Sequence, residues 1–110
     1  MDIMFRSASL RTSCNESKKG LRKYGDHRFR MIRRRLDEMR AAECLLDLPA
    51  SARCHPLRGK RVGQLAVHLD GGWRLVFEPA NDPLPLLPAG TVDWNQVTTV
   101  TVLEVVDYHE

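Results

Sequence analysis

The sequence lacks any apolar run near the length of a membrane-spanning helix. Such a helix needs roughly 20 consecutive apolar residues, and no uninterrupted apolar stretch in this 110-residue chain approaches that length. The first residues, MDIMFRSASL, also lack the basic segment and long apolar stretch of a secretory signal. We therefore expect a cytoplasmic protein that does not bind a membrane.

Cysteine is scarce, and its spacing does not suit a disulfide framework. Cys14, Cys44 and Cys54 are an odd number at wide intervals and contain no C-x-x-C pair, so neither a disulfide framework nor a zinc knuckle is indicated. We expect reduced thiols in the core or in loops, with no metal and no cofactor. The alternative is a zinc site from Cys54, His55 and His109, which contains no ligand pair at the usual spacing.

The chain also shows no internal repeat, and its charge is unevenly distributed. A chain of this length with 43% apolar residues can form one modest core, so we expect a single domain over residues 1–110. Residues 1–61 contain 16 Lys and Arg against 7 Asp and Glu, whereas residues 62–110 contain one Arg against 7 acids. The basic half fits nucleic acid, an acidic partner protein or a solvated helix face, and charge alone does not choose among these.

The first residues predict a short strand and a short helix. Residues 2–7 place apolar side chains on one side of an extended segment. Ser13, with Glu16 three residues later, resembles a capping box for a helix over residues 16–24. Gly20 weakens that helix by about 1 kcal/mol relative to alanine.

A second, longer helix is predicted over residues 27–46, with Asp26 as its cap. Apolar residues recur there at steps of three and four, which indicates one buried face, and arginines occupy much of the remainder. The apolar residues are Phe29, Ile32, Leu36, Met39 and Ala42, and the arginines are Arg28, Arg30, Arg33, Arg34, Arg35 and Arg40. This helix is therefore expected to be amphipathic and strongly basic.

The second half of the chain predicts three antiparallel strands. Residues 65–69 and 73–77 alternate with period two, and the Asp-Gly-Gly turn at residues 70–72 joins them as a hairpin. Residues 79–96 contain four prolines and are expected to form a loop insertion. Residues 97–106 are mostly β-branched and predict a long, central strand. The order of strand, two helices and three strands indicates an α+β fold.

The hairpin and the loop before it outline an anion site. Arg74 lies on the outward face of the hairpin, and its fixed fork of donors suits a phosphate. The loop upstream supplies His55, Arg58, Lys60 and Arg61. The last strand would bring Tyr108 and His109 toward Arg74. Alternatively, Arg74 pairs only with Glu78 or Glu104 across strands, and His109 belongs to a frayed tail.

Three stretches together carry a resemblance to a known family. They are CHPLRGKRVGQLAVHLDGGWRLVFEPANDP, the terminal VLEVVDYH and the preceding KYGDHRFRMIRRRLDEMRAAECLLDL. With its H-P-L-[KR]-G, W-R-L-x-F and D-Y-H motifs, nearly the whole chain resembles the HigB branch of the RelE/ParE toxin superfamily, the killer proteins of bacterial type II toxin-antitoxin systems.

This resemblance implies a fold, an activity and partners. The fold would be a small twisted antiparallel sheet of about four strands, packed against two N-terminal helices. The activity would be metal-independent cleavage of mRNA, ribosome-dependent in much of the family, which inhibits translation and growth. The partners would be mRNA on the ribosome and a helix-turn-helix, HigA-like antitoxin, an acidic segment of which would lie over the active surface.

The resemblance also implies roles for individual residues. His109 would be the general acid, and His55 either the general base or a group that positions the nucleotide. Arg74 would hold the phosphate, Asp107 would orient a histidine, and Tyr108 would stack on a base or donate its hydroxyl. RNA contacts would come from Arg58, Lys60 and Arg61, and antitoxin contacts from Arg33, Arg34 and Arg40.

One position departs from the family pattern, and two other functions stay open. The family often has lysine at the position of Arg58, which keeps the charge but does not transfer protons near neutral pH. One alternative is a ParE-like toxin that acts on DNA gyrase without nuclease chemistry. The other is a non-catalytic module that binds an antitoxin or nucleic acid.

Overall fold

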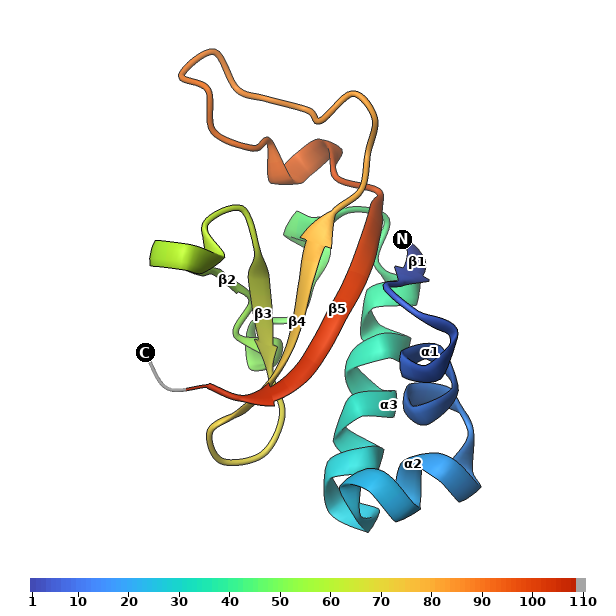
Figure 1. The fold of residues 1–110 in the computed structure, drawn as a ribbon. Coiled ribbons are helices and arrows are strands. Elements are labelled where there is room, and N and C mark those ends of the chain that lie inside the picture. Colours follow the sequence, from blue (N-terminus) through green and yellow to red (C-terminus); the bar gives the residue numbers. More distant parts are fainter. Residues whose placement is uncertain (109–110) are drawn as a thin grey trace.

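A computed structural model describes residues 1–108, which fold as a β-sheet with three α-helices on one face (Figure 1). This confirms the α+β prediction. The strands are β1 (Asp2–Phe5), β2 (His55–Pro56), β3 (Leu65–His68), β4 (Trp73–Pro79) and β5 (Thr99–Asp107), and the helices are α1 (Ala8–Asn15), α2 (Ser17–Tyr24) and α3 (Asp26–Ala41). No helix within residues 1–108 is long and apolar enough to cross a membrane.

The sheet has five strands in the order β1-β5-β4-β3-β2, and it is mixed. β1 pairs in parallel with β5, whereas the other neighbouring strands are antiparallel. The prediction of about four antiparallel strands is therefore wrong in number and in direction. The period of a strand does not reveal its partner, and the two-residue β2 is too short to show a period at all.

The predicted hairpin is confirmed. β3 and β4 pair antiparallel, with His68 opposite Arg74. Gly71 takes a positive φ of 53° in the turn between them, a backbone region open to glycine at little steric cost. The Pro-rich segment then runs outside the sheet (Figure 1), and the Asn81 side-chain oxygen fastens its ends by accepting from the Thr98 amide at 3.0 Å.

The helices differ from the predicted pair. α1 was missed; Ser7 caps it, because its side chain accepts from the Leu10 amide at 3.1 Å. Ser13 is not a cap, since its buried hydroxyl donates to the Leu10 carbonyl at 3.1 Å. α3 follows Gly25 rather than an Asp26 cap and ends at Ala41, five residues before the predicted end.

The core lies between the helices and the sheet. The predicted stripe of α3 is confirmed, because all five of its apolar residues are buried. Four of them, all except Ala42 just after the helix, pack with inward residues of β3, β4 and β5, among them Val67, Leu75, Phe77, Val100 and Val102. The helices therefore cover one face of the sheet. The opposite face, called the open face below, carries no α-helix within residues 1–108 (Figure 1).

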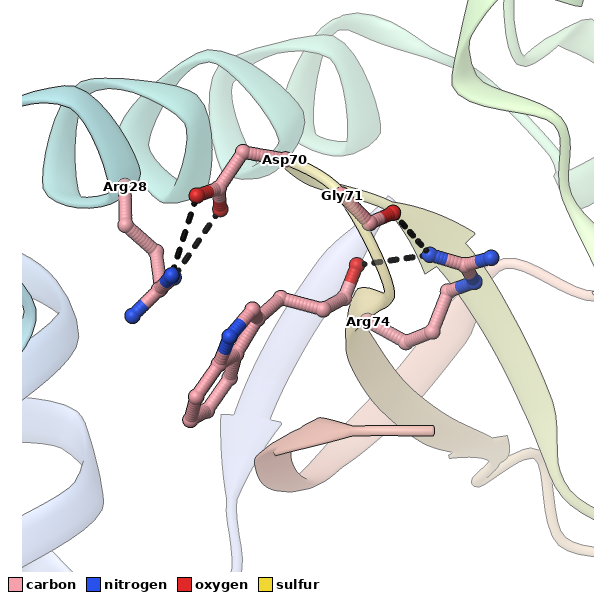
Figure 2. Close-up of polar contacts among 5 residues, drawn as sticks. Arg28, Asp70, Gly71 and Arg74 are labelled. Atoms are coloured by element: carbon pink, nitrogen blue, oxygen red, sulfur yellow. Dashed lines mark hydrogen bonds and ion pairs between the residues drawn. The ribbon is translucent and has the colours of Figure 1, made fainter. Parts of the chain in front are cut away.

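Two arginines predicted to be on the solvent side of α3 instead join it to the hairpin. Arg35 is only 5% exposed, and its Nε donates to the carbonyl of His68 at 2.7 Å. Arg28 donates through two nitrogens to Asp70 at 2.9 and 3.0 Å (Figure 2). Its guanidinium also lies over the ring of Trp73, 4.0 Å from the ring centroid. Partial burial would raise the pKa of Asp70, but the Arg28 guanidinium lowers it overall. This contact therefore favours the folded state near neutral pH and weakens as acid protonates Asp70.

Gly20 permits the close approach of α1, α2 and α3, a role that its weak helix propensity does not reveal. A Cβ atom there would lie 2.1 Å from a ring carbon of Phe29 and 2.6 Å from the carbonyl oxygen of Ser13.

We expect Gly20→Ala to lower the free energy of unfolding by about 2 kcal/mol, because the core must move to admit the methyl group. Urea denaturation measures this loss. Lys19→Ala, at an exposed position in the same helix, should change stability by no more than about 0.5 kcal/mol; equal effects would contradict the close-approach role.

Candidate active site

The open face carries a small second core that supports the candidate site. Leu57, Ala66, Val76 and Leu103 are buried together, and Val106 and Tyr108 pack against them. Side chains alternate between the two faces of a strand, so His68 and Arg74 share this open face with Ala66 and Val76. The loop between β2 and β3, which includes the 3₁₀ turn Gly59–Arg61, reaches over it from one edge.

His55 is fixed at the edge of this face by β2. Its backbone pairs with Ala66, and its ring lies edge-on to the ring of His68, with centroids 5.4 Å apart and an interplanar angle of 63°. The Nδ1 atom of His55 lies 2.8 Å from the carbonyl oxygen of Arg53. A carbonyl only accepts hydrogen bonds, so Nδ1 carries the proton and a neutral ring has its lone pair on Nε2. That Nε2 atom is buried, so a substrate reaches it only when neighbouring side chains move.

The carbonyl that orients His55 depends on an unusual backbone conformation. Arg53 has φ 50° and ψ 47°, the left-handed region, directly after the 3₁₀ turn Ala50–Ala52. Side chains other than glycine rarely adopt this region, and such conformations cluster at functional sites. Arg53 therefore contributes to the site through its main chain.

Arg74 lies opposite His68 in the register of β3 and β4. Its Nη1 atom donates to the carbonyl oxygens of Gly71 at 2.9 Å and Trp73 at 3.0 Å (Figure 2). Its Nε atom is buried and has no hydrogen-bond partner among residues 1–108. A buried donor without a partner costs roughly 1–3 kcal/mol, and more where the group is charged. The guanidinium therefore has one donor left for an anion, and an anion reaches this buried Nε atom only when neighbouring side chains move.

Tyr108 and Arg61 complete the open face. Tyr108 follows β5 directly and donates its backbone amide to the carbonyl of Gly72 at 2.9 Å. The guanidinium of Arg61 lies 5.4 Å from the Tyr108 ring centroid and forms an ion pair with Glu104. A groove of about 380 Å³ beside this pair is lined by Arg6, Lys60, Arg61, Gln64, Leu103 and Glu104. Arg61 is therefore partly neutralised, whereas Arg6 and Lys60 remain exposed cations.

The structure brings some of the predicted site residues together and not others. His55, Arg74 and Tyr108 share the open face, and the exposed Arg58 and Lys60 precede Arg61 in the loop above it. Asp107 pairs in register with Trp73, which packs on the helix side, so strand alternation places Asp107 on the face opposite Arg74. His109 lies outside the described residues. Within residues 1–108, Arg74 forms no ion pair with Glu78 or Glu104.

The residues predicted to bind an antitoxin lie on the helix side of the sheet. Arg33 and Arg34 are exposed on α3, and Arg40 donates to the side chain of Asn15 at 3.0 Å. A groove of about 610 Å³ between α2 and α3 is lined by Arg33 and Arg34, and its charge is mixed, because the lining includes Arg30 and also Asp26, Asp37 and Glu38. The basic helix and the basic loop thus lie on opposite sides of the sheet, and one short segment cannot cover both.

The cysteines contribute no reactive thiol to the open face. Cys54 precedes His55, but its side chain packs against the helix-side core. Burial raises the pKa of Cys54 to about 12 and the pKa of Cys14 to about 11. Both thiols are therefore protonated and unreactive near neutral pH.

Sequence reasoning missed three contributors to this site. His68 was not among the predicted site residues, yet counting the register back from the turn would have placed it opposite Arg74. The buried contact of Arg35 has no signal in the sequence. Its position adjoins the apolar stripe of α3, but a charged residue there is ordinarily expected to face solvent. The main-chain conformation of Arg53 likewise has no signal, since arginine is not a residue that favours it.

Comparisons with known proteins leave the family open. No protein-family model matches the sequence, and no curated protein matches it. What the chain does must therefore be argued from its own residues and their geometry.

Proposed function

We propose that this protein is the toxin of a type II toxin-antitoxin system, a metal-independent endonuclease of the HigB-like type that cleaves mRNA on the ribosome. One observation carries the proposal: the Arg74 guanidinium retains an unsatisfied donor on the open face, beside the two imidazoles of His55 and His68. Arginine is suited to a phosphate, and histidine is suited to proton transfer near neutral pH.

The proposed chemistry starts from the 2′-hydroxyl next to the scissile phosphate. Its oxygen loses a proton to a base and forms a bond to phosphorus, and the bond from phosphorus to the 5′ oxygen then breaks. The departing oxygen takes a proton, which leaves a 2′,3′-cyclic phosphate and a 5′-hydroxyl end. The Nε2 lone pair of His55 suits the base, and Arg74 neutralises the crowded phosphorane.

The remaining roles follow the family resemblance with one revision. His109 is the proposed acid, and Tyr108 is proposed to stack on a base or to donate its hydroxyl, which its packing on the open face supports. Arg58, Lys60 and Arg61 add positive charge for the RNA chain. Asp107 lies on the opposite face, so the geometry gives no support to a role for it in orienting His55.

The proposed antitoxin is a helix-turn-helix, HigA-like protein that contacts Arg33, Arg34 and Arg40. The groove between α2 and α3 offers Leu21, which is 41% exposed, as an apolar contact among these charges. Such an interface would be sensitive to salt. Because this side is remote from the open face, the antitoxin must either wrap around the sheet edge or leave the RNA face uncovered.

A reconstituted translation reaction tests the proposed function. Adding the wild-type protein to ribosomes translating a defined mRNA should produce new transcript ends carrying 5′-hydroxyl groups, with EDTA-treated protein equally active. His109→Ala should remove these ends and restore growth to cells that express the protein alone, because general acid catalysis contributes about 10²- to 10⁴-fold. Intact mRNA with DNA damage in expressing cells would indicate the gyrase-directed alternative, and unaffected growth with wild-type protein would indicate a binding module.

A further inference from the structure

His68 contacts the candidate base directly, and no role in the proposed chemistry explains it. Its ring meets the His55 ring edge-on, with 5.4 Å between the centroids. On the helix side of the sheet, the backbone of His68 in β3 also accepts a hydrogen bond. Arg35, buried in α3, donates from Nε to the His68 carbonyl at 2.7 Å and from Nη2 to the Ser51 carbonyl at 3.1 Å.

The second bond of Arg35 extends this support to His55. Ser51 belongs to the 3₁₀ turn Ala50–Ala52, which leads into the left-handed Arg53, and the Arg53 carbonyl lies 2.8 Å from Nδ1 of His55. One buried guanidinium thus fixes both the end of β3 that carries His68 and the turn that precedes His55. The carbonyl at Nδ1 of His55 and the contact of its ring with the His68 ring thus both depend on the same anchor.

We propose that His68 is a positioning residue that holds the ring of His55 in the tautomer and orientation required of the base. The proposal is based on the contact between the two rings, and we expect the shape of the His68 ring, rather than its charge, to hold His55 in place. An edge-to-face pair restricts rotation of the imidazole about its own side chain. This keeps the Nδ1 proton on the Arg53 carbonyl and the lone pair on Nε2. The expected effect on the cleavage rate rests on the proposed function. The expected effect on the tautomer of His55 does not.

The decisive experiment compares His68→Ala with His68→Phe, which retains an aromatic edge. Nitrogen-15 NMR of neutral His55 should show the Nδ1–H tautomer in the wild type and in His68→Phe, and a mixture of tautomers in His68→Ala. In single-turnover cleavage of ribosome-bound mRNA, His68→Ala should lower the maximal rate by about tenfold, the upper range for an aromatic pair. KM should stay within about twofold, and His68→Phe should restore most of the rate.

His27→Ala is the matched control, because it removes an exposed histidine at the start of α3, on the helix side of the sheet. Its His55 spectrum and cleavage rate should equal those of the wild type. A single Nδ1–H tautomer in His68→Ala would overturn the proposal, as would equal rate losses in His68→Ala and His68→Phe. Wild-type protein that shows the expected spectra but cleaves no RNA would refute the proposed function while leaving the positioning geometry intact.

Discussion

Arg74→Ala is expected to lower the rate of RNA cleavage by about 10²- to 10³-fold, as removal of one preorganised donor from an anionic transition state commonly does. The wild-type guanidinium is held by two carbonyls at the hairpin turn, so it is preorganised before the substrate arrives. Arg74→Lys should recover only a small part of the rate, because an ammonium ion cannot reproduce the planar fork. Single-turnover cleavage with saturating ribosome complex measures both variants.

The control for Arg74 must remove a positive charge without touching the site. Arg22, exposed on α2 and on the helix side, serves this purpose, and Arg22→Ala should cleave at close to the wild-type rate. Circular dichroism and thermal unfolding establish that each variant is folded. If Arg74→Ala cleaves as fast as Arg22→Ala, the open face is not the catalytic surface.

Arg35→Ala is expected to reduce the free energy of unfolding by about 4 kcal/mol, in the range for breaking a buried charged network by removing one partner. The substitution leaves the carbonyls of His68 and Ser51 without their donor, leaves Glu38 without its 2.8 Å partner and opens a cavity. Urea denaturation followed by far-ultraviolet circular dichroism gives the difference.

Arg34→Ala is the matched comparison for this loss, because Arg34 is adjacent in sequence and approaches the same Glu38 at 3.6 Å from the solvent side. An exposed ion pair of this kind contributes about 0 to 1 kcal/mol. The two variants therefore separate a buried anchor from a surface pair within one helix. Equal losses would mean that the buried bonds of Arg35 add nothing to stability.

The parts of the fold that the sequence predicted are those governed by local periodicity. The alternation around Asp70-Gly71-Gly72 predicted β3, β4 and the turn, and the steps of three and four predicted the buried face of α3. The parallel pairing of β1 with β5 could not be predicted in this way, because its direction is set by packing between residues about 97 positions apart. The early end of α3 also depends on a tertiary contact, because the Leu45 amide donates to the Val97 carbonyl at 3.0 Å instead of continuing the helix.

The candidate site was predictable only where side-chain chemistry and strand register sufficed. Arg74 and His55 were identified from residue type and place, and Tyr108 from its position just beyond the last strand. Asp107 was grouped with Tyr108 although neighbouring strand residues point to opposite faces. The constraints on His55 depend on a main-chain carbonyl and on a buried arginine from another element, and neither leaves a pattern in the sequence.

The position of β5 between β1 and β4 has a consequence for the synthesis of the protein. β1 has no neighbour in the sheet until residues 99–107 insert beside it. Until then β4 pairs only with β3. A nascent chain therefore cannot close its sheet, or set Tyr108 beside the hairpin turn, until those codons have been translated and the segment has left the exit tunnel. For a protein proposed to attack translating ribosomes, this order of assembly delays activity until residues 99–107 have emerged from the ribosome that makes it.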